Sequence, residues 1–517
     1  MRLSRKLSLP LLALLVAATG CARCSGAKAA PERFMAADDS AVVIVPTLGA
    51  LSRQTSDILA TLATFPRGGA LLDGRAVVGA RLGFDPLDAA ALAANGLDPK
   101  RGAAIGVRGL GGMSPQPTFT LPVADAGKFD AMVTRIAQQR LAMPVRAVVA
   151  GKPEIVTYAN EAGAAVGLAY AIAEGTAIVA AGPEAEAGVK AALAVPADKH
   201  LGTTQGFKTA MAAVGPDLAA IFYVPAGSDL AKNFPQYQGG VVDGLRGAKD
   251  RFGFVVGRLL GTTASAAPPV KGDSAALLAK LDPAAALLAR SDSSPQAFMN
   301  DGELRAALQR QHFPEELAGA LADGFGAMAP GAVLGVALVP VTDPAAQLRE
   351  APLGFFRAEG ILTVKDAAKM KDVVKRLLTL ATQGQLELAA EGPWTFPLPG
   401  GEASLSVEGQ RLYVAAGPAG ALKALIARSG STFKPPTPTS ASVLQSPLGG
   451  LVVDVPRLAA GVKAIPASAY GDGGEVFHAN VQGWATTASR ITAVSVSSEL
   501  VPGAQRGEII VEVAPAK

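Results

Sequence analysis

The feature of this sequence that most restricts its fold is an internal repetition. The segment LPVADAGKFDAMVTRIA, which begins at Leu121, matches LTVKDAAKMKDVVKRLL, which begins at Leu362. Further along, EGTAIVAAGP from Glu174 matches EGQRLYVAAGP from Glu408, and a later IFYVP matches VVDVP. The offset drifts from 241 residues (362 − 121) to 231 (456 − 225), as it would after changes in loop length. Three matches in the same order indicate a duplication.

The repetition predicts two domains of similar fold joined by a linker. The segment GTTASAAPPVKGDS, from Gly261, is rich in small residues, polar residues and proline, which is typical of a linker. We therefore expect a first repeat at 31–263, a linker at 264–274 and a second repeat at 275–517. The sharper expectation is a superposition of residues 117–260 on 357–513, with Gly182 over Gly417 and Pro225 over Pro456.

The repeated blocks predict a strand followed by a helix. TFTLPV and AEGILTV are rich in residues that favour strands, and the stretches that follow, 125–141 and 366–381, carry apolar residues at helical spacing. Asp125 and Asp366 stand where a side-chain oxygen can accept from the free N–H groups of a first helical turn. We interpret both as helix caps rather than catalytic acids.

The next blocks predict antiparallel hairpins. AYAIAEGTAIVAAG and ASLSVEGQRLYVAAG each place two short apolar runs around a Glu-Gly turn, where Gly175 and Gly409 can adopt a positive φ. The C-terminal ITAVSVSSELVPGAQRGEIIVEV has the same character. Hairpins that alternate with amphipathic helices favour the α+β class. We predict two similar halves, each with a mainly antiparallel sheet and helices packed on one face.

The first twenty residues have the three parts of an export signal. Arg2, Arg5 and Lys6 precede an apolar run, and small residues lead to Cys21. The run is shorter than the roughly 20 apolar residues that span a bilayer. Cys21 and Cys24 form a C-x-x-C pair, which in a cytosolic protein indicates a redox or metal motif. Behind an export signal we expect instead a signal peptide at 1–20 and a lipidated tether at 21–30.

Small residues before a cysteine resemble the lipobox of bacterial lipoproteins. The resemblance implies cleavage before Cys21, acylation of its thiol with diacylglycerol and of its new amino group with a fatty acid such as palmitate. Ala22, in place of aspartate, implies sorting to the outer membrane, facing the periplasm or the cell surface. The order of blocks behind this signal also resembles a family of exported bacterial proteins with a tandem domain of unknown function, which implies no activity and no site residues.

Composition narrows the class of protein. The chain has 517 residues, 50% of them hydrophobic and 17% charged, which is typical of a globular protein. The formal charge of +4 includes three cationic residues of the signal, so the processed chain carries +1. The sequence shows no long Lys/Arg run and no interleaving of basic with aromatic residues. We therefore expect no nucleic-acid partner.

Residues able to hold a metal or perform catalysis are sparse. His200, His312 and His478 are the only histidines, and they stand far apart in the sequence. The sequence contains neither H-E-x-x-H nor G-x-S-x-G. We expect the three histidines not to converge, and we predict no catalytic residue, no metal site and no cofactor.

Three further motifs allow two interpretations each. GVRGLGGMSPQP, from Gly106, could bind phosphate, but it lacks Gly-Lys-Ser/Thr and favours a connection between strands. Asp472 and Glu475, separated by glycines, could bind calcium, but a solvated turn explains them as well. Trp394 could contact a partner or pack in the interior.

The sequence therefore predicts a membrane-anchored lipoprotein of the cell envelope, without enzymatic activity, that binds or scaffolds. The alternative is a carrier for an apolar or lipid-like ligand, held in a groove beside a sheet. Expected partners are the membrane, through the lipid on Cys21, and either envelope proteins or an apolar ligand. A hydrolase that uses dispersed carboxylates is a third class.

Overall fold

The computed structural model describes residues 29–66, 68–110, 115–141, 143–161, 166–233, 239–259, 272–293, 301–338, 355–385, 388–398, 401–430, 433–465 and 474–515. The chain forms two compact units. Unit 1 contains residues up to Leu59, Ala70–Gly247 and Gly257–Leu259, and unit 2 contains Ala60–Gly69, Ala248–Val256 and the chain from Leu260 onward. Two short segments of the first half of the chain thus belong to the second unit. Most of the expected linker, residues 264–271, lies outside the described residues.

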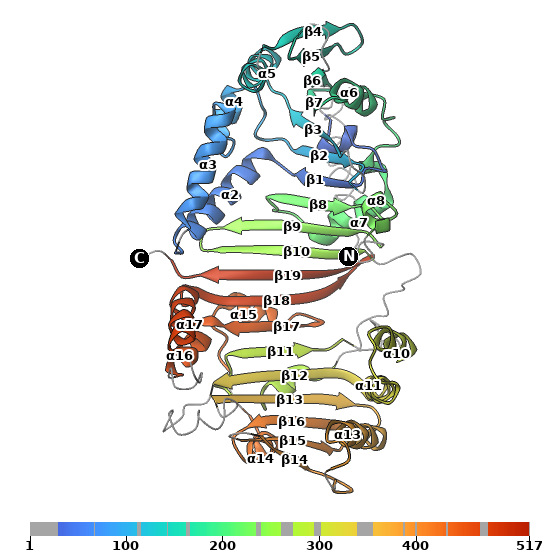
Figure 1. Ribbon diagram of the computed structural model, residues 1–517, viewed down its shortest axis with the longest axis vertical. Helices are drawn as coiled ribbons and strands as arrows, with labels where there is room; N and C mark the ends of the chain where they lie inside the picture. Colours follow the sequence, from blue (N-terminus) through green and yellow to red (C-terminus); the bar gives the residue numbers. More distant parts are fainter. Residues whose placement is uncertain are drawn as a thin grey trace, which may run out of the picture. The chain divides into compact units, whose positions relative to one another are not determined.

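Unit 1 is built on an antiparallel sheet in the order β4-β5-β6-β7-β3-β2-β1-β8-β9 (Figure 1). Its strands are β1 (Ala41–Val45), β2 (Ala103–Arg108), β3 (Gln116–Pro122), β4 (Val145–Val149), β5 (Ile155–Ala159), β6 (Val166–Ala173), β7 (Thr176–Ala181), β8 (Ala220–Val224) and β9 (Val241–Ala248). Strand β10 (Arg251–Leu259) begins in unit 2 and ends in unit 1.

Unit 2 has an antiparallel sheet in the order β14-β15-β16-β13-β12-β11-β17-β18-β19. Its strands are β11 (Leu287–Ser291), β12 (Met328–Leu338), β13 (Phe356–Val364), β14 (Trp394–Leu398), β15 (Gly401–Glu408), β16 (Arg411–Gly417), β17 (Gly449–Asp454), β18 (Ile491–Val501) and β19 (Ala504–Val513). The α+β class and the antiparallel pairing predicted from the sequence are confirmed.

The order β14-β15-β16-β13-β12-β11-β17-β18 in unit 2 matches the order β5-β6-β7-β3-β2-β1-β8-β9 in unit 1, where β4 is an additional edge strand. The register agrees as well. Pro122 of β3 pairs with Thr176 of β7, and Thr363 of β13 pairs with Arg411 of β16. These positions are related by the same offsets of 241 (363 − 122) and 235 (411 − 176) that the sequence repetition shows. The superposition of residues 117–260 on 357–513 stays a prediction.

The helices of unit 1 are α2 (Leu48–Ala63), α3 (Gly69–Leu82), α4 (Ala89–Ala94), α5 (Ala126–Arg140), α6 (Ala185–Leu193), α7 (Gln205–Val214) and α8 (Asp229–Asn233) with the 3-10 turns η2 (Pro31–Phe34) and η3 (Leu201–Thr203). Those of unit 2 are α9 (Ser274–Leu278), α10 (Asp301–Arg310), α11 (Glu315–Ala327), α13 (Ala367–Ala381), α14 (Ala421–Ala427), α15 (Pro438–Val443), α16 (Val455–Ala464) and α17 (Gly474–Ala488). The predicted caps are confirmed: Asp125 accepts from the Lys128 N–H at 3.1 Å, and Asp366 accepts from the Lys369 N–H at 2.9 Å.

Helices cover both faces of each sheet, which corrects the expectation that they pack on one face. In β7, Ala177 faces the core that α5 completes, whereas Ile178 and Ala180 face the core that α6 completes. In β16, Leu412 packs with α13, and Tyr413 packs with α14. The reason is visible in the strand sequences, because consecutive apolar residues point to opposite faces and each face then needs a cover.

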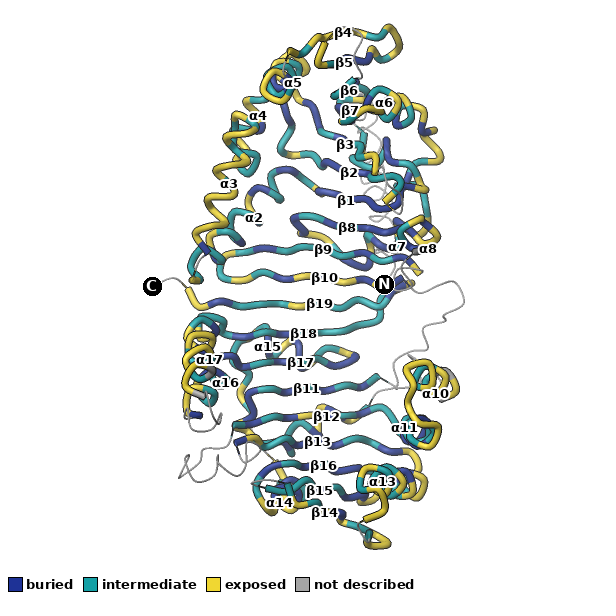
Figure 2. The backbone as a smooth tube through the Cα atoms, in the orientation of Figure 1, coloured by how far each residue is buried: buried dark blue, intermediate teal, exposed yellow. Residues whose placement is uncertain are grey.

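Helix α3 differs from the other long helices of unit 1. None of its residues is buried, and it is exposed along most of its length (Figure 2). By contrast, α5 buries Phe129, Met132, Val133 and Ala137 against the sheet.

A buried carboxylate holds several elements of unit 2 together. Glu359 of β13 is 1% exposed and accepts two hydrogen bonds from Arg428, at 2.8 and 3.1 Å. It also accepts from the Asp282 N–H at 2.8 Å. The Glu359 carboxylate raises the pKa of Arg428, because its hydrogen bonds favour the charged guanidinium. The pair thus ties the end of α14 and the turn before β11 to a central strand.

We predict that Glu359→Ala lowers the free energy of unfolding by about 3 kcal/mol, because it leaves the partly buried Arg428 guanidinium and the Asp282 N–H without their acceptor. Urea denaturation followed by circular dichroism measures the loss. The control is Asp372→Ala, which removes an exposed ion pair with Arg376 and should cost about 0.3–0.5 kcal/mol. Equal effects of the two substitutions would show that the buried pair has no special role.

Candidate functional site

One face of the unit 2 sheet carries a row of apolar positions that helices leave partly open. The strand registers align Val414 of β16, Gly360 of β13, Leu334 of β12, Ala289 of β11 and Leu451 of β17 across the sheet. Leu334 is 44% exposed even though it stands on an inner strand. The small residues Gly360 and Ala289 beside Leu334 project little above the sheet, so the surface forms a depression there.

We call this depression the sheet-face hollow. It has a volume of about 370 Å³ and opens to solvent. The residues on this face are Ala289, Ser291, Ala332, Leu334, Ala358, Gly360, Leu362, Val414 and Ala416. Its walls are almost entirely carbon, and its volume lies within the range of small-molecule sites, about 300–1,000 Å³.

Charged residues beside the hollow have their charged groups engaged elsewhere. Glu359 and Arg290 contribute to the lining, but they alternate with residues whose side chains form the hollow. Glu359 binds Arg428, and Arg290 binds Asp292 at 3.1 Å. The hollow can therefore hold an apolar group, but its described lining residues offer no free charged group that could orient a polar substrate.

Unit 1 carries a related row on its own sheet. The registers align Val179, Phe119, Ile105, Val43 and Phe222, all of them partly exposed. The row continues to Asp243 of β9, which pairs with Phe222. Oδ1 of Asp243 is buried without a hydrogen-bond partner, and burial raises the pKa of this carboxyl.

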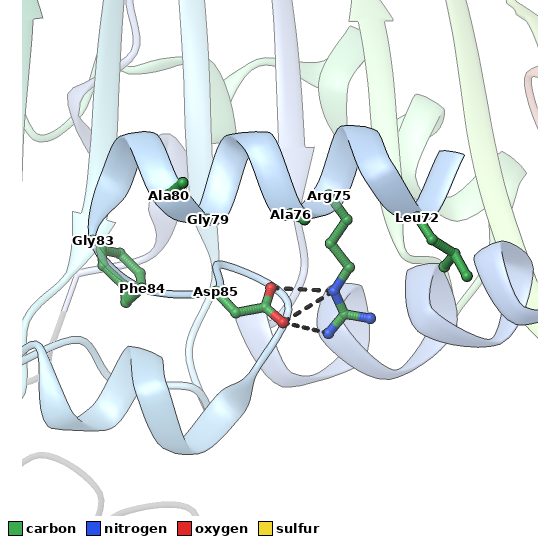
Figure 3. Close-up of a pocket in the computed structure, with 8 residues that line it drawn as sticks. All are labelled: Leu72, Arg75, Ala76, Gly79, Ala80, Gly83, Phe84 and Asp85. Atoms are coloured by element: carbon green, nitrogen blue, oxygen red, sulfur yellow. Dashed lines mark hydrogen bonds and ion pairs between the residues drawn. The ribbon is translucent and has the colours of Figure 1, made fainter. Parts of the chain in front are cut away.

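A second hollow lies beside α3, with a volume of about 610 Å³ (Figure 3). Leu72, Ala76 and Ala80 of α3 line it together with Phe84. Its polar feature is an ion pair in which Arg75 Nε donates to Asp85 Oδ2 at 3.0 Å and Nη2 donates to the same oxygen at 2.5 Å. Arg75 lowers the pKa of Asp85 through these hydrogen bonds. The ion pair fastens α3 to the loop that follows it.

The three histidines lie in different elements. His200 precedes η3 and accepts from the Gly202 N–H at 3.1 Å. His312 follows α10 with a φ of 63°, and His478 lies in α17, 3.0 Å from Gln482. Among the residues that the structure describes, no cluster of three or more His, Cys, Asp or Glu side chains is suited to a metal ion.

The other sequence candidates divide into two groups. Cys21, Cys24, Asp472 and residues 111–114 of the glycine-rich loop lie outside the described residues, and Glu475 belongs to the first turn of α17. Trp394 is 2% exposed and donates to the Ala389 carbonyl at 2.9 Å, which favours the packing interpretation. No sequence motif marks Leu334, Gly360 or α3, because only strand pairing and solvent exposure distinguish them from other apolar positions.

Comparisons with known proteins add little. No protein-family model matches the chain, and the search of curated proteins gives no match. Among solved structures, three crystal forms of the Treponema protein TP0453 align with 46% of this chain and with 81–84% of their own. Their identity to this chain is 8–11% and their TM-scores are 0.24–0.26. At these values the likeness carries no argument about fold or function.

We predict that Asp243→Asn stabilises the protein by about 1 kcal/mol at pH 7, because it removes a charge that burial disfavours. The carboxyl is neutral in both states below its ordinary pKa of 3.8, so the gain should vanish there. As the pH rises from 3.8 through the raised pKa of the folded state, the penalty on the native protein grows and then stays constant. Urea denaturation of both proteins across this pH range measures the difference, and a gain independent of pH would contradict the prediction.

Proposed function

We propose that this protein is a lipid-anchored protein of the cell envelope that acts by binding an apolar, lipid-like molecule rather than by catalysis. The observation that carries the binding role is the sheet-face hollow. Its carbon-lined walls, its volume of about 370 Å³ and the absence of a free charge among its described lining side chains suit an acyl chain better than a polar substrate.

The anchor in this proposal rests on the export signal and Cys21. A triacylated cysteine would attach the chain firmly, because each buried methylene contributes about 0.8 kcal/mol and stable attachment needs at least two lipid chains. None of the helices in the described ranges is long and apolar enough to cross a membrane.

Scaffolding of envelope proteins is the second candidate. Strand β4 forms one edge of the unit 1 sheet, and Val145 and Val148 on it are 42% and 46% exposed. An exposed edge strand offers unpaired backbone groups to an extended segment of a partner. This role and ligand binding need different surfaces, so variants of the hollow separate them.

We predict that Cys21→Ser abolishes acylation and leaves uncleaved or mislocalised precursor. Metabolic labelling with an alkyne fatty acid, followed by click detection on a gel, measures acylation. Cys24→Ser is the matched control, and it should retain the label because only the first cysteine follows the small residues of the signal. Undiminished label in Cys21→Ser would remove the anchor from the proposal.

We also predict that Gly360→Ile empties the hollow of its ligand. A Cβ at Gly360 would meet its nearest atoms at 3.7–3.9 Å, so an isoleucine fits the strand and projects into the hollow. Gly507→Ile is the matched control, because a Cβ there meets its nearest atoms at the same distances, 3.7–3.9 Å, outside the hollow.

The measurement is mass spectrometry of apolar compounds extracted from each purified protein. We expect a compound in stoichiometric amount with the wild type and with Gly507→Ile, reduced at least tenfold with Gly360→Ile. Equal amounts in all three proteins would contradict a ligand in the hollow and favour the scaffolding role.

A further inference from the structure

Helix α3 exposes apolar side chains on more than one side. Leu71 and Leu72 are each 44% exposed, and Val77 and Val78 are 51% and 46% exposed. No residue of this 14-residue helix is buried. A surface helix of a globular protein normally buries one apolar stripe and presents polar residues to water. Helix α3 buries no such stripe, so its exposed leucine and valine side chains face water at an energetic cost.

The apolar residues surround the helix rather than form a stripe. At 100° per residue, Leu71 and Val78 share one side, and Val77 is turned by more than 90° from both. Leu72 is turned toward the hollow beside Ala76 and Ala80 (Figure 3). A helix that is apolar all round is typical of one surrounded by apolar material. A folded protein partner would cover one side of α3, whereas mobile lipid chains and headgroups can contact several sides of a helix at the membrane surface.

The N-terminal tether restricts how far unit 1 can be from a membrane. Ala29 lies eight residue steps after Cys21, so the tether reaches at most about 28 Å at 3.5 Å per step. Ala29 is fixed to unit 1, because its N–H donates to the Glu174 carbonyl at 3.2 Å and its carbonyl accepts from Arg101 Nη2 at 2.8 Å. Residues 70–82 of α3 belong to the same unit. A lipid on Cys21 would therefore hold unit 1 close to the bilayer.

The length and charge of α3 suit the surface of a bilayer rather than its full width. Fourteen residues give about 21 Å of helix, less than the hydrocarbon thickness of about 30 Å. The helix also carries Asp73, Arg75 and Arg81, and Arg75 is paired with Asp85, so these charged groups favour the polar headgroup region over the hydrocarbon core.

We propose that α3 lies in the interfacial region of the bilayer and forms a second, non-covalent membrane contact of this protein. The proposal rests on the proposed lipid anchor, which brings unit 1 to the bilayer. The ion pair between Arg75 and Asp85 then holds the helix at the border of unit 1, where its apolar side chains reach the headgroup and acyl boundary.

The test places an environment-sensitive label on α3 in the full-length acylated protein. Cys24→Ser removes the second thiol, and Val77→Cys then receives a nitrobenzoxadiazole label. The protein is reconstituted into vesicles of phosphatidylcholine and phosphatidylglycerol that contain doxyl-labelled lipid. We expect at least twofold quenching at position 77. The matched control is a label on Met143→Cys, which is also in unit 1 and 73% exposed but lies between α5 and β4, and it should be quenched little.

A second variant separates insertion from general proximity to the bilayer. Leu71→Asp combined with Val78→Asp should reduce the quenching at position 77 at least twofold, while acylation of Cys21 is unchanged. Both side chains are about half exposed, so the fold should tolerate the change. Absence of quenching at position 77 in protein that is bound to vesicles through its lipid would overturn the role of α3 and leave the anchor intact.

If Cys21 proves to carry no lipid, the same label is read with added vesicles. Quenching at position 77 would then support α3 as an independent membrane contact. Lack of quenching there would overturn it.

Discussion

Packing on both faces of the sheets is the constraint on which the rest of this structure depends. Strands such as β7 and β16 carry apolar residues at consecutive positions, so each strand contributes to two cores at once. Helices α5 and α13 complete one core, and α6 and α14 complete the other. Because a shift of one residue would exchange the two faces, the cores and the register of the hairpins specify each other.

Two carboxylates in these apolar sheets, Glu359 in unit 2 and Asp243 in unit 1, differ in whether they have hydrogen-bond partners. The Glu359 carboxylate accepts hydrogen bonds from the backbone N–H of Asp282 and from the side chain of Arg428. Asp243 lies on an apolar row without a partner for Oδ1. The first arrangement stabilises unit 2, whereas the second costs unit 1 stability, because desolvation of a charge is offset only when hydrogen bonds replace water. The two units thus share a pattern of strands and differ in how their polar residues are satisfied.

Two apolar surfaces are left without a complete cover, and the functional proposals rest on them. The sheet-face hollow exists because small residues surround Leu334 on a face that helices cover only in part. Helix α3 stands apart because nothing in unit 1 buries it. Exposed apolar surface lowers stability in water, so a lipid-like ligand in the hollow and a bilayer around α3 would each remove part of that cost. A protein held to a membrane by lipid would meet both kinds of molecule.

The sequence by itself determined the α+β class, the antiparallel hairpins, the helix caps at Asp125 and Asp366, and the repeated order of blocks. These depend on local spacing: a period of two for strands, about 3.6 for helices, and an acceptor oxygen before a first turn. Only the tertiary structure decided that helices cover both faces, that Trp394 is buried, and that Leu334 and α3 remain exposed. The solvent exposure of each position depends on which residues, distant in the sequence, pack against it. An apolar residue in the sequence can therefore be buried or exposed in the structure.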